Sequence, residues 1–283
     1  MHRTRFALPF LALLALNSST VWSADEPAAP PPRQGGGESA TALAKAAQNP
    51  VANMISIPFQ YNANLNYGPE EKTQSILNIQ PVYPIHLTPD WNIITRTIVP
   101  LISQPPLTPQ QDRENGIGDI QLSLFLSPNR SDGFIWGAGV IGQFDTASDD
   151  RLGQGKYCLG PTAVGLKIEG PWVAGALINN LWSVSGDSDR PDVNQMLLQP
   201  FINYNFPDHP GRYLTFSPII TANWEASGDN VWTVPVGLGI GQIIKLDGKL
   251  PLNLQASAYY NVVTPDYGPD WQIRLQVSIL LPK

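Results

Sequence analysis

Strict alternation of apolar and polar residues is the clearest pattern in this chain, and it is strongest near the C-terminus. Over residues 271–279 every odd position is apolar and every even position is polar. Residues 252–262 and 118–126 repeat the pattern. Successive side chains of a strand point to opposite faces, so each segment predicts a strand with one apolar face and one wet face.

Less regular segments fill the intervals and bring the predicted strands to twelve. They are residues 54–65, 73–85, 91–102, 117–127, 134–144, 158–168, 172–183, 194–204, 213–224, 231–243, 252–262 and 271–281. A tilted membrane strand needs about 9–11 residues, and bacterial outer-membrane barrels have an even number of strands. Short turns such as 169–171 alternate with longer loops such as 145–157, an arrangement that places the N-terminus in the periplasm.

We therefore predict an all-β fold, an antiparallel transmembrane β-barrel of about 12 strands with a short N-terminal helix. A secreted sandwich or jelly roll also alternates. Its outer face should carry charge, whereas here the polar face is mainly Asn and Gln. Charged residues are 14% of the chain, against roughly a quarter in soluble domains. There is no apolar run of about 18 residues, so no membrane helix is predicted.

The N-terminal 50 residues divide into three segments. Arg3 and Arg5 precede an apolar run and then small residues around Ala24, the pattern of a cleaved signal peptide. We predict a signal peptide over 1–24, a Pro- and Gly-rich linker over 25–37, a short helix over 38–50 and an outer-membrane barrel over 51–283. The helix either plugs the barrel mouth or lies loose in the periplasm.

Aromatic residues are predicted at both rims of the barrel, because one end of the ring is apolar and the other can hydrogen-bond. Four should lie near the periplasmic rim: Trp91, Trp136, Trp172 and Tyr213. Four should lie near the outer rim: Trp182, Trp224, Trp232 and Trp271.

The predicted inner faces collect amide side chains and two arginines. An Arg facing lipid costs about 2–4 kcal/mol at the bilayer midplane, so both arginines should face inward. The predicted lumen-lining residues are Gln60, Asn62, Asn78, Gln80, Arg96, Gln121, Gln199, Asn203, Asn253, Gln255, Gln272, Arg274 and Gln276. These groups can bind water and a passing solute, or bind one another and close the lumen.

One predicted strand has small residues on its inner face, namely Pro235, Gly237, Gly239 and Gly241. They leave room for a solute path or for packing of the N-terminal helix. A tight bend of the barrel wall explains them equally well.

Several function classes are disfavoured by composition. Without residues 1–24 the chain has 15 Lys and Arg against 23 Asp and Glu, a net charge of −8 with no basic cluster, so no nucleic acid is expected. Cys158 is the only cysteine, which excludes an intrachain disulfide, and we expect no cofactor. Weak metal candidates are Asp187, Asp189 and Asp192, whose carboxylates could hold Ca²⁺; a solvated loop is the simpler interpretation.

An enzyme is the rival class. Outer-membrane hydrolases need a base, usually His, next to a Ser or water. Beyond the signal peptide only His86 and His209 remain, and both fall in predicted periplasmic connections without a neighbouring Ser/Asp set. We predict no catalytic residues and no enzymatic activity.

Several short motifs resemble one bacterial family. They are residues 48–53 (QNPVAN), 57–60 (IPFQ), 77–82 (LNIQPV), 116–120 (GIGDI), 179–183 (NNLWS), 189–194 (DRPDVN), 199–204 (QPFINY) and 259–262 (YYNV). The chain resembles the outer-membrane family associated with the meta-pathway of phenol degradation, whose members are often labelled transporters and sometimes mislabelled neuromedin U. The resemblance covers about residues 45–283. It implies a barrel that takes up small molecules, aromatic or hydrophobic ones included.

These observations predict an outer-membrane channel or transporter for small molecules, exported by a cleaved signal peptide. The alternative is a non-transporting structural or surface-binding barrel. Expected partners are outer-membrane lipids, a small-molecule solute and the barrel-assembly machinery during biogenesis. Outer-membrane barrels commonly end on an aromatic residue recognised during assembly, whereas the last two residues here are Pro282 and Lys283.

Overall fold

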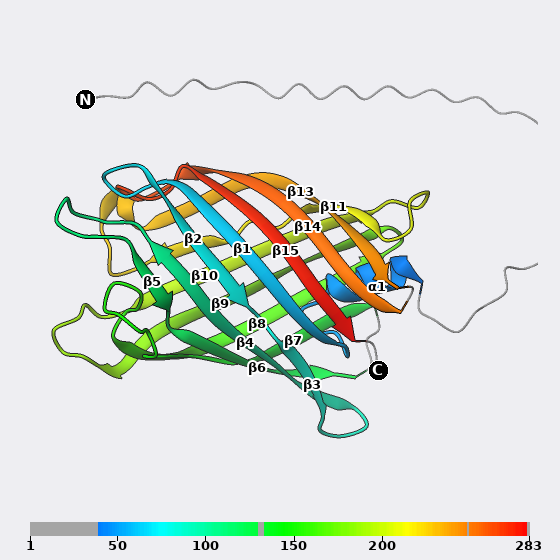
Figure 1. Ribbon diagram of the computed structural model, residues 1–283. Coiled ribbons are helices and arrows are strands. Elements are labelled where there is room, and N and C mark those ends of the chain that lie inside the picture. The colour runs from blue at the N-terminus through cyan, green and yellow to red at the C-terminus, as the bar shows by residue number, and fades with distance from the viewer. Residues whose placement is uncertain (1–38, 130–132, 248, 282–283) are drawn as a thin grey trace, which may run out of the picture. The chain divides into compact units, whose positions relative to one another are not determined.

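The barrel wall is one antiparallel sheet that closes on itself. The structure is a computed structural model that describes residues 39–129, 133–247 and 249–281. Its strands are β1 (Ile55–Tyr67), β2 (Lys72–Ile79), β3 (Val82–His86), β4 (Trp91–Gln104), β5 (Glu114–Ile117), β6 (Ile120–Pro128), β7 (Phe134–Phe144), β8 (Lys156–Glu169), β9 (Trp172–Gly186), β10 (Asn194–Asn205), β11 (Arg212–Phe216), β12 (Ile220–Asn223), β13 (Trp232–Leu246), β14 (Leu250–Val263) and β15 (Trp271–Leu281). Strands pair with their neighbours along the chain, and β15 pairs with β1 to close the barrel (Figure 1).

The fifteen segments make up twelve strands of the barrel, because three of these strands are each divided into two segments. The interruptions separate β2 from β3 at Pro81, β5 from β6 at Gly118, and β11 from β12 at Pro218. Proline has no N–H to donate to the ladder, which accounts for two of the breaks. The predicted fold class, an antiparallel barrel of 12 strands with a short helix, is confirmed. The predicted signal peptide and linker lie outside the described residues.

The outer face of the barrel is apolar and exposed. Along β15 the outward Leu275 and Val277 are 49% and 42% exposed, while the inward Arg274 between Ile273 and Leu275 is 3% exposed. Leu238 on β13 is 55% exposed. So large a continuous exposed apolar surface indicates a face in contact with lipid.

No helix in the described residues has the length and apolar character needed to cross a membrane.

Aromatic rings border the apolar face at both ends. Trp224 and Trp232 pack edge to face at 5.3 Å near the long loops, and Trp91 and Trp136 do so at 5.9 Å near the short turns. Tyr213 does not belong to either rim, so that prediction is wrong. Its side chain points inward and is 1% exposed, because β11 places Arg212 and Leu214 on the outer face.

The helix α1 (Ala40–Ala47) packs inside one end of the barrel, at the same end as the C-terminal end of β15 (Figure 1). Ser39 Oγ accepts a hydrogen bond from the N–H of Ala42 (3.1 Å) and caps the helix. Its apolar side is buried: Leu43 packs in a cluster with Met54, Tyr213, Ile243 and Leu280. Of the two placements considered for this helix, the structure shows the docked one.

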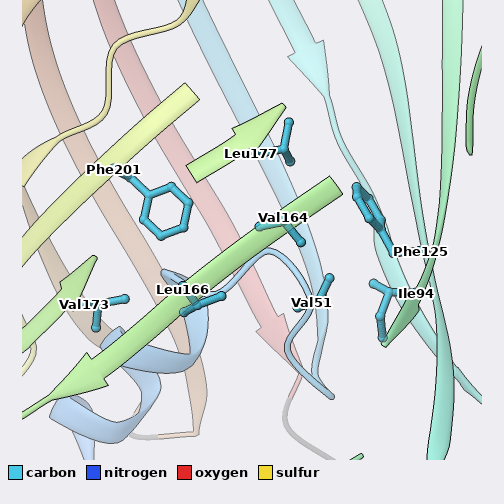
Figure 2. Packing of buried hydrophobic residues seen from close by; sticks show 8 residues of the cluster. All are labelled: Val51, Ile94, Phe125, Val164, Leu166, Val173, Leu177 and Phe201. Carbon is cyan, nitrogen blue, oxygen red and sulfur yellow. The ribbon is translucent and has the colours of Figure 1, made fainter. Parts of the chain in front are cut away.

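A second apolar cluster fills part of the barrel interior. Figure 2 shows its eight side chains, Val51, Ile94, Phe125, Val164, Leu166, Val173, Leu177 and Phe201. Seven of them come from β4, β6, β8, β9 and β10, and Val51 comes from the segment that follows α1. On this side of the barrel the inner face is apolar, and its side chains pack as in a protein core.

Candidate functional site in the barrel lumen

The polar side of the lumen encloses a cavity of about 160 Å³ beside the segment that follows α1. Nine of the predicted lumen-lining residues meet there: Gln60, Gln80, Arg96, Gln199, Asn203, Asn253, Gln255, Arg274 and Gln276. They come from opposite parts of the sequence because β1 pairs with both β2 and β15, which closes the barrel. Residues Ala46–Ala47 and the segment after them form one wall of this cavity, which we call the inner cavity.

The other four predicted residues lie elsewhere on inner faces. Asn62 accepts a hydrogen bond from Arg274 Nε (3.3 Å), and Asn78 is the register partner of Gln60. Gln272 donates to Asn261 (3.1 Å). Gln121 borders a larger cavity of about 740 Å³ toward the long loops, which we call the outer cavity. That these thirteen side chains contact a solute stays a prediction.

Tyr213 is one of the inner-cavity residues that were not predicted from the sequence. Its hydroxyl donates to Asn253 Oδ1 (2.9 Å) and lies 3.2 Å from Gln255 Oε1. Its ring lies over Gly241, where an added Cβ would meet the ring at 2.1 Å. The inward glycine therefore makes room for a tyrosine and, through it, for the helix. The inward glycines of β13 were the sequence feature that indicated space at this position. Which side chain fills that space could not be inferred without the register between β11 and β13.

The loop between β7 and β8 folds back onto the inner face of the barrel, a placement that the sequence did not predict. Asp119, 9% exposed, accepts from the backbone N–H of Thr146 (3.3 Å), Ala147 (3.3 Å) and Gln154 (2.7 Å). Gln154 continues the contact by donating to Gln195 Oε1 (3.0 Å).

Two glycines make room for this loop. A Cβ on Gly116 would meet Ser148 Oγ at 2.0 Å, and one on Gly118 would meet the carbonyl oxygen of Leu152 at 3.0 Å. The motif at residues 116–119 therefore forms the seat of the loop. Farther out, the backbone N–H and the guanidinium of Arg151 stabilise the charged form of the partly exposed Asp149 and lower the pKa of its carboxyl group.

The candidate metal ligands do not converge. Asp187 accepts from the backbone N–H of Asp189 (2.9 Å), and Asp192 accepts from Lys156 Nζ (3.4 Å) and Ser183 Oγ (3.2 Å). Over the described residues, no group of three or more His, Cys, Asp or Glu side chains is placed to hold a metal ion. Local turn geometry and an ion pair account for the contacts of Asp187 and Asp192, and calcium binding at these residues stays a prediction.

Both histidines have other partners. His86 Nδ1 lies 2.8 Å from Asn92 Oδ1, and the His209 ring packs edge-on against Phe206 with centroids 6.5 Å apart. In the part of the chain that the structure describes, neither is hydrogen-bonded to a serine or a carboxylate, so a nucleophile–base pair is not assembled at either position.

No protein-family model matches this chain, and no curated protein matches its sequence. Solved structures do match its fold. An outer membrane channel from Pseudomonas putida F1 superposes with a TM-score of 0.57 at 15% identity, over 81% of this chain and 94% of that one. The NanC porin gives 0.49 at 9% identity over 81% and 99%, and outer membrane phospholipase A from Escherichia coli gives 0.44 at 15% over 87% and 99%. The chain has the fold of an outer-membrane β-barrel.

Proposed function

We propose that the protein is a channel for small molecules in the outer membrane of a Gram-negative cell, exported by a cleaved signal peptide. The single observation that carries the proposal is a polar, cavity-containing lumen inside an apolar outer wall. The outer cavity of about 740 Å³ and the inner cavity of about 160 Å³ are both bordered by inward amide side chains. Such groups can exchange hydrogen bonds with water and a solute. The proposal assigns no catalytic residue.

Aromatic or hydrophobic small molecules are the proposed solute class. The family resemblance of the sequence motifs suggests it, and the composition of the inner cavity supports it. Its lining includes Phe201 and Leu177 from the apolar cluster as well as the amides. A solute with an apolar body can contact one side while its polar atoms bind the other.

Docking of α1 makes the channel hypothesis testable, because the helix occupies one end of the lumen. Besides its apolar contacts, Lys45 Nζ donates to the carbonyl oxygen of Gly170 (2.7 Å), and the amides of Gln48 and Asn205 exchange two hydrogen bonds (3.0 and 3.1 Å). We infer that α1 narrows the conducting path.

Replacing Leu43 by Asp should raise single-channel conductance in planar bilayers. The side chain is 2% exposed, and a carboxylate buried there without a partner is strongly disfavoured, so the helix should leave its seat. The matched control is Ala42→Asp, which adds the same charge on the exposed side of the same helix and should leave conductance near that of the unmodified protein.

The alternative, a structural or surface-binding barrel, predicts a different result. If the unmodified protein and Leu43→Asp are both silent in bilayers and neither admits small solutes into liposomes, while both remain folded, the channel proposal fails. The acidic loops would then be the surface to examine by Asp→Asn changes.

A further inference from the structure

Among the described residues, the lining of the inner cavity has two positive charges and no negative one. Of the twenty-four residues that line it, Arg96 and Arg274 are the charged ones, and none is Asp, Glu, Lys or His. The arginine guanidinium stays charged in proteins. The cavity therefore carries two cations in a chain whose overall net charge is −6.

Arg274 is buried and bonded to neutral groups. Its side chain is 3% exposed. Nη1 donates to the carbonyl oxygen of Ser217 (2.9 Å), Nε donates to Asn62 Oδ1 (3.3 Å), and the guanidinium carbon lies 5.0 Å from the centroid of the Tyr259 ring. Burying a charge is costly unless an opposite charge accompanies it. These partners fix the orientation of the group without neutralising it.

Arg96 has even fewer partners. Its one side-chain hydrogen bond within the described residues runs from Nη2 to Gln80 Oε1 (2.6 Å). A guanidinium has five N–H donors in a planar fork that matches a carboxylate. Most of the donors of Arg96 thus have no acceptor among the residues that the structure describes, in a cavity that the other lumen arginine also lines.

Two cations near the loops do have carboxylate partners. Arg151 pairs with Glu114 and Asp149, and the nearly buried Lys156 pairs with Asp192. Neither lumen arginine has a carboxylate within ion-pair distance among the described residues. The two lumen arginines therefore line one cavity without a carboxylate partner, and an anion from outside can supply the missing charge there.

We propose that the inner cavity is a binding site for the carboxylate of a small organic anion with an apolar body, held between Arg96 and Arg274. As the solute class of the channel, this rests on the proposed function. Amide and hydroxyl donors around the arginines can complete the shell of the carboxylate, and Phe201 and Leu177 can contact the apolar part. Cavities of roughly 150 Å³ accept a benzene-sized molecule, so a single ring with one carboxylate suits the volume of about 160 Å³.

The test is calorimetric titration of benzoate into the full-length protein in detergent micelles, with empty micelles as the blank. Benzoate should bind, and benzyl alcohol, which lacks the charge, should bind at least about tenfold more weakly, because it forms no charge-assisted pair. Inorganic phosphate has charge without an apolar body and should also bind more weakly. Arg96→Gln and Arg274→Gln should each weaken benzoate binding by about tenfold or more.

Arg113→Gln is the matched control, since Arg113 bonds Ser103 and the carbonyl of Thr73 near the long loops, away from the cavity lining. It should leave benzoate affinity unchanged. If Arg274→Gln does not fold, the test uses Arg96→Gln and Arg274→Lys instead. Arg274→Lys keeps the positive charge and should bind benzoate more tightly than Arg96→Gln does. Equal binding of benzoate and benzyl alcohol, or unchanged affinity in Arg96→Gln, would overturn the proposal.

Binding and conductance are read separately, so the two proposals can fail independently. Benzoate binding without flux leaves the site standing and removes the channel. Flux of small solutes without arginine-dependent benzoate binding leaves the channel standing and removes the site.

Discussion

Leu275→Arg is expected to lower the free energy of unfolding by about 2–4 kcal/mol when the barrel is embedded in lipid, the cost of an arginine at the bilayer midplane. Leu275 is the fifth of the eleven residues of β15, near the middle of the strand, and its side chain is 49% exposed on the outer face. Urea titration of the protein folded into lipid vesicles measures the change.

The control for this substitution is Tyr267→Arg. Tyr267 lies in the loop between β14 and β15 and is 68% exposed, more than Leu275. A residue that faces water tolerates the new charge, so its effect should be small. If both substitutions cost the same, the apolar face of the barrel is not in contact with lipid, and the membrane assignment loses its physical basis.

Alternation allowed the wall of the barrel to be predicted almost completely. The twelve predicted strands match the twelve of the structure, and the last was predicted over the same residues as β15. The outward side chains of a membrane strand contact lipid and no other part of the protein. Their apolar character therefore depends only on their position along the strand, which gives the period-2 pattern. Arg274 was placed inward on the same energetic argument, and the structure buries it there.

What fills the barrel could not be predicted in the same way. Phe125 occupies a position of β6 where the alternation predicts a polar, inward-facing residue. Its side chain does point inward, but it packs with the apolar Ile94 and Val164. Whether an inward position is wet or dry depends on the side chains across the lumen, and these come from strands distant in sequence. Tyr213 was misplaced for the same reason, because its neighbours Gly241 and Asn253 are on β13 and β14.

The second prediction concerns the β7–β8 loop, which is held on the inner face of the barrel by Asp119. Asp119→Ala should release this loop from the barrel interior and make the folded protein sensitive to trypsin after Arg151. The substitution leaves three backbone N–H groups, those of Thr146, Ala147 and Gln154, without their acceptor. A buried donor left unpaired costs about 1–3 kcal/mol; Ala147 and Gln154 are half-buried, whereas Thr146 is exposed. These costs favour a released conformation of the loop, in which water solvates the N–H groups, over the conformation docked on the inner face.

Cleavage should therefore accelerate by about a hundredfold or more, the factor that corresponds to roughly 2.7 kcal/mol of loop opening. Mass spectrometry of the fragments identifies the cut after Arg151 and separates it from a cut after Lys156, the next basic residue along the chain. The matched control is Asp150→Ala, which removes an exposed carboxylate from the same loop and should not change the rate. In bilayers, Asp119→Ala should also conduct more than Asp150→Ala, because the released loop no longer occupies the lumen. Equal cleavage rates in the two variants would show that Asp119 does not hold the loop.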